Sequence, residues 1–425
     1  MARDKIISAI DVGSNKVTTV VATVDLEGGT SVIGVSTVPS AGLRKGQVVD
    51  IDAAVTAISA GVDATERMAG LSIGSAFISV GGSHIQSQNS KGVVAVAEPE
   101  GEITPIDIKR VTDAARAISI PSSREIIHVL PRGFVVDGQE GIKDPVGMTG
   151  VRLEVETQIV TGATTTIRNL AKCISEIGID IDGLVFSGLA SSHAVLSETE
   201  KELGVILVDI GGGTTDIAIY VDGALSFSSV LPVGAKNVTN DLAIGLRVSL
   251  ESAEKIKLAL AVKPKYAVEK SKEEDELDVT GLDLPEEVKK VSRKTLIEGI
   301  IKPRLSELFT YVGVELQKSG LSGLTPSGIV ITGGGAETIG ILETARTRLV
   351  MPCRIGSPVG LTGLVDEISK PMYSTAYGLI LYGRENGVQK MNNLPKLTSF
   401  GSMASKLPIK NIVGKIGKFL KNFLP

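Results

Sequence analysis

The chain has 425 residues, a formal net charge of −4 and 43% hydrophobic residues. This length is enough for roughly two to four domains or subdomains with cores of their own, and the charge gives no general attraction to nucleic acid. Three His residues and two distant cysteines, Cys173 and Cys353, leave neither a metal-ligand cluster nor a disulfide framework. We therefore expect the protein to reside in the reducing cytoplasm. No apolar run is long enough to span a bilayer.

The first 83 residues alternate sheet and helix. Residues 5–24 form two hydrophobic runs around the turn Asp11-Val12-Gly13-Ser14, which predicts a β-hairpin. Residues 51–70 show helical periodicity and end at Gly70, a residue typical of helix C-termini. The run FISVGG at 77–82 is expected to close this unit as a strand.

Residues 84–161 break this pattern. Their order of strand, helix, strand, strand predicts a small inserted α+β subdomain with its own core. The runs 91–98 and 154–160 are candidate edge strands that could join a neighbour or receive a partner strand. The chain then continues with a helix expected at 165–178, a strand at 182–188 and a single helix at 191–203.

The opening theme recurs at residue 204. The run VILVDIGGGTTDIAIYV repeats strand, Asp-x-Gly turn and strand, and its Asp209 lies 198 residues after Asp11. Such self-similarity predicts two lobes of related fold that face each other. Residues 328–340 indicate a strand, a triple-glycine turn and a helix start, and residues 371–383 indicate the last helix.

The glycine turns carry the chemistry. Glycine lets the backbone approach a ligand and adopt positive φ, so consecutive N–H groups can point at one anion. Two such turns, one in each lobe, could hold a polyphosphate between them, and the third could approach a flat base or ribose. The expected contacts are Asp11, Gly13, Ser14, Asn15, Lys16, Asp209, Gly211, Gly212, Gly213, Thr214, Thr215, Asp216, Gly333, Gly334, Gly335 and Ala336.

Carboxylates beside these turns predict a magnesium site. Asp11 and Asp209, together with Asp216, are hard oxygen groups placed to hold the waters of a Mg²⁺ ion. One such turn alone would be an ordinary hairpin, but three in this order are specific. The sequence has no GxxxxGK[ST] motif and no GxGxxG that opens a helix after the first strand, so neither a P-loop nor a dinucleotide fold is supported.

The motifs DVGSNK, DIGGGTTD and TGGGA, in this order, resemble those of the actin, DnaK and sugar-kinase superfamily. Within it, GLRKGQVVDIDAAV, VGGSHIQSQNSKGVVAV, DPVGMTGVRLEVETQIVTG, FSGLASSHAVL and PMYSTAYGLILYG are similar to stretches of FtsA, a bacterial cell-division family. The resemblance implies an α/β, actin-like ATPase fold with two related lobes that bind ATP and Mg²⁺. It also implies that Gly234, Glu254 and Lys257 complete the nucleotide site, although spacing alone equally allows a Glu254–Lys257 surface ion pair.

The resemblance sets the expected domain boundaries. The first lobe takes 1–83 and 162–200, the inserted subdomain 84–161, the second lobe 201–235 and 309–383, and its subdomain 236–308, before a flexible linker at 384–408 and an amphipathic helix at 409–425.

The family's partners are implied in the same way. A member self-associates into filaments, tethers the tubulin-like FtsZ to the cytoplasmic face of the cell membrane at the septum, and helps to recruit later division proteins, here through residues 84–161. The FtsZ tail would dock on residues 236–308, where Arg304 could pair bidentately with a carboxylate of an acidic peptide and Glu307 could take a Lys or Arg. On pattern alone, both residues could belong to an ordinary exposed helix face. No nucleic-acid partner is expected.

The last residues interleave apolar side chains with lysines. At 100° per residue the apolar ones fall within one arc of about 140°, which predicts a helix lying flat in an anionic membrane surface. A core helix and a docking helix for a partner groove remain as alternatives. The apolar arc comprises Ile412, Val413, Ile416, Phe419, Leu420, Phe423 and Leu424, and the lysines beside it are Lys415, Lys418 and Lys421.

Two other functions remain open at this point. A sugar or acid kinase of the superfamily needs a carboxylate to accept the substrate's hydroxyl proton; Asp182 is the candidate, but aromatic residues are only 3% and Trp is absent. A PilM-like platform of pilus machines would share the fold and the nucleotide turns. We expect at most slow ATP hydrolysis, because residues 161–170, TGATTTIRNL, offer no Gln or Glu to orient the attacking water.

Overall fold

The computed structural model describes residues 5–97, 101–261 and 275–387. The expected amphipathic helix at 409–425 and the linker from residue 388 onward lie outside these residues. Among the described helices, none is both long and apolar enough to cross a membrane.

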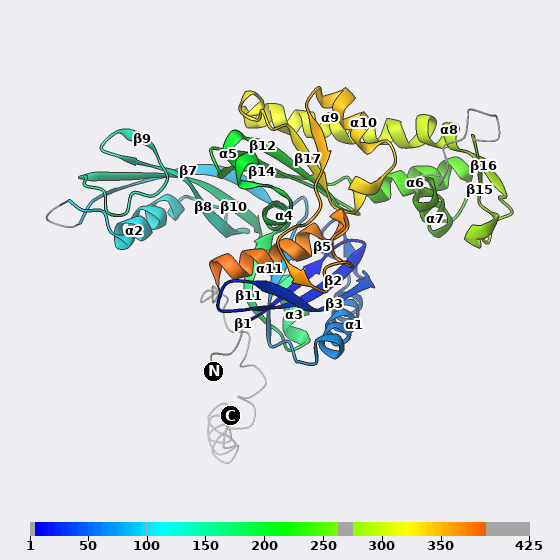
Figure 1. The fold of residues 1–425 in the computed structure, drawn as a ribbon, viewed down its shortest axis with the longest axis horizontal. Coiled ribbons are helices and arrows are strands. Elements are labelled where there is room, and N and C mark those ends of the chain that lie inside the picture. Colours follow the sequence, from blue (N-terminus) through cyan, green and yellow to red (C-terminus); the bar gives the residue numbers. More distant parts are fainter. Residues whose placement is uncertain (1–4, 98–100, 262–274, 388–425) are drawn as a thin grey trace, which may run out of the picture. The chain divides into compact units, whose positions relative to one another are not determined.

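A six-stranded sheet forms the first lobe (Figure 1). In spatial order its strands are β11 (Asp180–Phe186), β6 (Ser75–Val80), β1 (Lys5–Val12), β2 (Lys16–Val24), β3 (Thr30–Pro39) and β19 (Thr362–Gly363). The hairpin of β1 and β2 is confirmed and pairs antiparallel over its whole length. Helix α1 (Ile51–Ala69) begins at Asp50, whose carboxylate accepts the N–H of Ala53, and ends at Gly70 in the left-handed region, as predicted.

A five-stranded sheet forms the second lobe and repeats the hairpin. Its order is β14 (Ala224–Leu231), β13 (Thr215–Val221), β12 (Val205–Ile210), β17 (Ile329–Thr332) and β18 (Cys353–Ile355). Side chains of β12 alternate between two cores: Leu207 packs with the first lobe, whereas Ile206 and Val208 pack in the second lobe's own core. The two lobes therefore share a hydrophobic core, to which both β1 and β12 contribute side chains.

Helices surround the second lobe's core. This core is enclosed by residues of α6 (Ala235–Leu246), α7 (Leu250–Ala261), α9 (Lys302–Ser319) and α10 (Ile341–Leu349). Shorter elements complete this part of the second lobe: α8 (Arg293–Leu296), a π-helical turn at Ile297–Ile301, and the strand pair β15 (Glu276–Asp278) and β16 (Lys290–Ser292). In the first lobe, β4 (Leu43–Arg44) pairs with β5 (Gln47–Val48). Short 3₁₀ turns occupy Thr280–Leu282, Ser322–Leu324, Gly334–Glu337 and Pro371–Tyr373.

The inserted subdomain has its own sheet and its own core. The sheet order is β7 (Gln86–Ala95), β10 (Arg152–Ala163), β8 (Arg124–Val136) and β9 (Gln139–Ile142), and helix α2 (Pro105–Arg116) lies along it (Figure 1). The short β9 was not expected. β7 is an edge strand, as predicted, but β10 lies between β7 and β8, so the expectation that 154–160 forms an edge is wrong.

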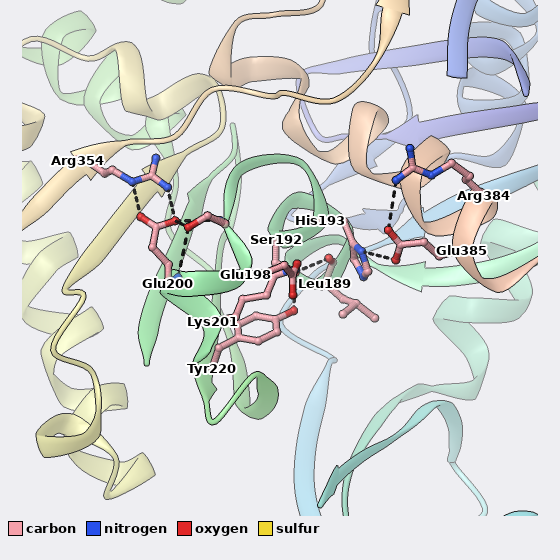
Figure 2. Close-up of polar contacts among 11 residues, drawn as sticks. Leu189, Ser192, His193, Glu198, Glu200, Lys201, Tyr220, Arg354, Arg384 and Glu385 are labelled. Carbon is pink, nitrogen blue, oxygen red and sulfur yellow. Dashed lines mark hydrogen bonds and ion pairs between the residues drawn. The ribbon is translucent and has the colours of Figure 1, made fainter. Parts of the chain in front are cut away.

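The helix expected at 191–203 is two helices. Helix α4 (Ser187–Val195) ends before Ser197, which caps α5 (Glu198–Leu203) by accepting the N–H of Glu200. Arg354 of β18 stabilises the break between the two helices, because its guanidinium donates to the carboxylate of Glu200 (Figure 2). It also donates to the carbonyl of Val195.

The last helix is longer than predicted and belongs with the first lobe. Helix α11 (Ser374–Asn386) includes residues 384–386, which were expected in the linker. Nδ1 of His193 in α4 lies 3.1 Å from the carboxylate of Glu385 (Figure 2). The α11 residues Leu379 and Ile380 are in the core shared with the first sheet, and β19 pairs with β3. The assignment of 309–383 to the second lobe is therefore corrected for residues 362–383.

Candidate functional site

A cavity of about 280 Å³ lies where the three glycine turns converge. The first two turns close in the same way: Gly13 N–H donates to Lys16 O at 3.1 Å, and Gly211 N–H donates to Thr214 O at 2.9 Å. They also face each other closely, since a Cβ built on Gly212 would lie 2.9 Å from Cβ of Asn15. Glycine is thus required where the two turns approach.

Most residues expected at the nucleotide site line this one cavity. From the first two turns these are Asp11, Gly13, Ser14, Asn15, Lys16, Asp209, Gly211, Gly212, Gly213, Thr214 and Asp216, and from the rest of the second lobe Glu254, Lys257, Gly333, Gly334 and Gly335.

Three expected residues do not line the cavity. Thr215 points to the opposite face of β13, where its hydroxyl donates to Val233 O at 2.8 Å. Gly234 is the N-cap of α6 and packs against the carbonyls of the second turn, so it supports the turn from behind. Ala336 is buried in the second lobe's core. Their contact with a ligand therefore stays a prediction that the lining of this cavity does not support.

Sequence reasoning missed several lining residues. Lys236 of α6 donates to Ser14 O at 2.8 Å and so connects the second lobe's subdomain to the first turn. Thr375 belongs to a segment interpreted only as a helix, although its hydroxyl donates to Asp209. The remaining lining residues that were missed are Val12, Gly46, Gly81, Ser187, Ala235, Leu258, Glu337 and Met372.

Three buried carboxylates face the cavity. Asp11 accepts a hydrogen bond from Ser79 at 2.8 Å, and Asp209 accepts hydrogen bonds from Ser191 and Thr375. Burial raises the pKa of Asp11 and raises that of Asp209 to about 6. Burial, together with the charges of Asp209 and Asp11, raises the pKa of Asp216 well above its ordinary value. This concentration of acids is costly to ionise without a cation.

Two buried polar atoms at the site lack a hydrogen-bond partner among the described residues. They are Oδ1 of Asp216 and Nζ of Lys16. Burial lowers the pKa of Lys16 to about 8, although the charges of Asp11, Glu337 and Asp209 oppose this shift. Buried polar atoms without a hydrogen-bond partner are rare in a finished core, so the cavity is arranged to receive an anion beside Lys16 and a cation beside Asp216.

Glu254 and Lys257 are both an ion pair and part of the cavity wall. Lys257 Nζ lies 2.7 Å from Glu254 and 3.0 Å from the hydroxyl of Thr239. Both residues belong to α7 and line the cavity. The two interpretations of this pair are therefore compatible.

The residues considered for other chemistry lie elsewhere. Asp182, the candidate kinase base, accepts a hydrogen bond from Ser75 at 2.8 Å and does not line the cavity. Residues 164–170 begin helix α3 (Thr164–Glu176), and none of them lines the cavity. Within the described residues, no group of three or more His, Cys, Asp or Glu side chains is positioned to ligate a metal directly.

A second cavity, of about 270 Å³, adjoins Arg304 and Glu307. Arg304 is not free there. Its Nε and Nη2 lie 2.5 and 3.0 Å from the two carboxylate oxygens of Asp241, and Nη1 contacts Glu307. Glu307 also accepts the hydroxyl of Tyr311 at 2.9 Å. The bidentate pair expected with a peptide is made here within the chain.

Comparison with known proteins places the whole chain in one family. A family model for the SHS2 domain inserted in FtsA matches residues 82–161, and the model for cell division protein FtsA matches residues 206–378. Cell division protein FtsA of Pseudomonas aeruginosa is 41% identical over 410 residues, which is 95% of each chain. This chain belongs to the FtsA family.

Other FtsA proteins give the same result. Those of Escherichia coli K12 and Bacillus subtilis are 36% and 38% identical and are matched over 96% and 85% of their lengths. The family makes the chain a cell-division protein with an actin-like ATPase fold.

Solved structures agree on the fold. A PilM–PilN type IV pilus biogenesis complex superposes with a TM-score of 0.63 at 14% identity, over 89% of this chain and 98% of that one. MreB 5 of Spiroplasma citri bound to AMPPNP gives 0.52 at 14% identity, over 91% and 98%. At such identity the likeness to PilM concerns the fold alone, so the pilus-platform alternative has no support beyond it.

Proposed function

We propose that this FtsA-family chain binds ATP with Mg²⁺ between its lobes, assembles into filaments and tethers FtsZ to the cytoplasmic face of the membrane at the septum. The observation that carries the nucleotide part is the cavity between paired Asp-x-Gly turns, where Lys16 Nζ and Asp216 Oδ1 are buried without a hydrogen-bond partner among the described residues. A polyphosphate and its metal ion would supply the missing partner of each. The AMPPNP bound to MreB 5, an actin-like protein of the same fold, supports this choice of ligand.

The donor set fits a magnesium ion held through water. Asp11 and Asp209 present carboxylate oxygens to the cavity while Ser79, Ser191 and Thr375 hydrogen-bond to them from behind. Mg²⁺ retains several waters and takes one or two carboxylates, which suits two acids that do not form a direct ligand cluster. The ion would neutralise phosphate charge, while the turn N–H groups and Lys16 would orient the phosphates.

Hydrolysis is expected to be slow. The stretch 164–170 contributes no side chain to the cavity, and it offers no Gln or Glu. Without a group that orients the attacking water, a large part of the barrier lowering is lost. A turnover of many ATP per second by the purified protein would contradict this proposal.

The second cavity, which borders α9 and is called the groove from here on, is the proposed site for the tail of FtsZ. It combines the apolar side chains of Ile300 and Pro303 with the charged residues Arg304, Glu307 and Asp241. A peptide could bury apolar side chains there and exchange ion pairs with this charged group. Later division proteins are proposed to contact the inserted subdomain, in which β7 is an edge strand of the sheet.

Membrane attachment is assigned to the terminal segment 409–425. Its apolar side chains would each contribute on the order of 1 kcal/mol, and each lysine about 1 kcal/mol near anionic lipid. The cost of ordering a short helix leaves one tail only marginally bound. A filament with many tails would bind tightly through avidity, which couples assembly to attachment.

Vesicle co-sedimentation, with electron microscopy of the pellets, tests the assembled proposal. The full chain with ATP and Mg²⁺ should pellet with anionic vesicles, form filaments on them, and retain an added FtsZ tail peptide. The double variant Phe419→Glu plus Phe423→Glu should stay in the supernatant while still binding ATP. A double variant that pellets as the parent does would show that the tail is not the anchor, and a parent that fails to bind ATP would overturn the nucleotide assignment.

A further inference from the structure

The segment Pro371–Thr375, at the start of α11, reaches all three turns of the cavity. At the third turn, the carbonyl of Pro371 accepts the N–H of Gly333 at 3.1 Å. At the second, the hydroxyl of Thr375 donates to Asp209 at 3.2 Å. At the first, the segment offers neither a carbonyl nor a hydroxyl but an aromatic ring.

That ring belongs to Tyr373, and it lies against the ammonium group of Lys16. Nζ of Lys16 is 3.6 Å from the centroid of the ring, which is the distance of a direct cation–π contact. The same Nζ is buried and has no hydrogen-bond partner in the described part of the chain. The ring face is therefore the contact that holds this cation in the free pocket.

We propose that Tyr373 is a positioning residue for nucleotide binding, whose ring face keeps the Lys16 ammonium directed at the phosphates and away from the neighbouring carboxylates. The inference rests on the proposed function and adds to it a residue that no Asp-x-Gly motif contains.

The alternative partners of Lys16 explain why a ring is useful here. Asp11, Glu337 and Asp209 all attract the ammonium electrostatically. A direct ion pair with Asp11 or Asp209 would remove the cation that a phosphate needs, and would also occupy a carboxylate that the metal ion needs. An aromatic face attracts the ammonium without neutralising it. Because the ammonium has three N–H donors, those not directed at the ring remain available to phosphate oxygens.

The anchoring of the segment supports a fixed position for the ring. The buried hydroxyl of Ser374 lies 2.5 Å from that of Thr332, at the end of β17, and also donates to Pro371 O at 2.9 Å. Tyr373 N–H donates to Lys370 O at 3.0 Å. The ring thus projects from a backbone that is tied to β17 through Ser374 and closed by a local turn to Lys370.

A graded change of ring electrons tests this role without a change of shape. Tyr373 is replaced by phenylalanine and by phenylalanine analogues with one, two or three ring fluorines, because each fluorine withdraws electron density from the face. We expect Tyr373→Phe to bind Mg²⁺-ATP within about twofold of the parent, and affinity to fall stepwise with fluorine number to between about 3-fold and 30-fold weaker. Adenosine, which has no phosphate to meet Lys16, should bind each analogue equally.

The controls separate this inference from the proposed function. The same analogues placed at Tyr311, on α9, should leave ATP affinity unchanged. ATP binding that does not depend on fluorine number would overturn the role of Tyr373 and leave the nucleotide site standing. A parent protein that binds no ATP by calorimetry would instead overturn the proposed function itself.

Discussion

Two cavities have similar volumes, about 280 Å³ at the turns and about 270 Å³ at α9. They differ in whether their charged side chains have partners within the protein. At the turns, Lys16 Nζ and Asp216 Oδ1 are buried without hydrogen-bond partners among the described residues. At α9, all three nitrogens of the Arg304 guanidinium are paired with Asp241 or Glu307.

This difference indicates two modes of recognition. Buried groups without partners destabilise the free protein, and a ligand that supplies those partners recovers the lost free energy on binding. A groove whose charges are already paired gains little from a new ion pair unless the internal pair is exchanged. The first cavity is therefore preorganised for its ligand, and the second must rearrange its ion pairs to accept one.

The largest expected effect is at Asp209. Asp209→Asn removes the charge that faces the metal waters but keeps an oxygen to accept from Ser191 and Thr375. We expect Mg²⁺-ATP to bind more than about 100-fold more weakly, close to 3 kcal/mol, while binding measured without Mg²⁺ changes little. Calorimetry with and without Mg²⁺ measures both quantities, and an unchanged affinity would exclude Asp209 from the metal site.

The same variant tests whether Asp209 lowers the free energy of unfolding of the ligand-free protein at neutral pH. The pKa of Asp209 is about 6 in the folded protein against 3.8 for an ordinary Asp, so folding favours its protonated form. The resulting stability is present below about pH 4 and is lost as pH rises through about 6. Asp209→Asn, which stays neutral, should therefore gain stability over the parent as pH rises, by a difference on the order of 3 kcal/mol. Urea titrations at pH 4 and pH 8 measure this difference, and a gap independent of pH would contradict it.

The next effect is steric and concerns the third turn. A Cβ on Gly334 would meet only Cβ of Met372 at 3.7 Å, an ordinary contact, whereas a Cβ on Gly335 would lie 2.3 Å from Cγ2 of Ile210. Gly334→Val should thus fold normally but obstruct the adenosine side, weakening ATP binding by roughly 30-fold, or about 2 kcal/mol. Gly335→Ala is the matched control and should lower the unfolding free energy by about 2 kcal/mol. Normal ATP binding by Gly334→Val would mean that the base does not approach this turn.

The sequence predicted what depends on local chemistry. Residues of all three predicted glycine turns line the cavity. The two hairpins and α1 form at the positions that hydrophobic periodicity and cap residues predict. The strand alternation could have excluded Thr215, since neighbours in a strand point to opposite faces. The capping box Ser197-x-x-Glu200 could have revealed the break between α4 and α5.

What the sequence could not predict depends on packing between distant segments. The position of β10 inside its sheet is set by pairing, and hydrophobic period does not report strand order. The contact of Tyr373 with Lys16 exists because α11 packs against the first lobe after the chain has passed through the second. The pairing of Arg304 with Asp241 joins residues 63 positions apart, so the helical pattern around Arg304 gave no sign that its charge was occupied.

The smallest expected effect tests the groove at α9. Asp241→Asn should release Arg304 from its bidentate carboxylate and leave it to Glu307 and to an incoming peptide. Arg304, Asp241 and Glu307 together carry a net charge of −1, which disfavours an acidic peptide in the free protein. Removing one carboxylate makes this group neutral and frees the fork of donors that matches a carboxylate. We expect an acidic FtsZ tail peptide to bind about 10-fold more tightly, or ~1.4 kcal/mol.

The matched control for this variant is Glu298→Gln. It removes one negative charge next to Gly299 and Ile300, which line the groove. Glu298 pairs with Lys302 at 2.8 Å and has no contact with Arg304 among the described interactions. If only net charge matters, both variants should tighten peptide binding equally, and the effect should vanish at high salt. If exchange of the internal ion pair matters, Asp241→Asn should exceed Glu298→Gln, and the double variant Asp241→Asn plus Arg304→Ala should lose the gain. Fluorescence anisotropy of a labelled peptide at two salt concentrations distinguishes these outcomes, and a loss of affinity in Asp241→Asn would show that Asp241 itself contacts the peptide.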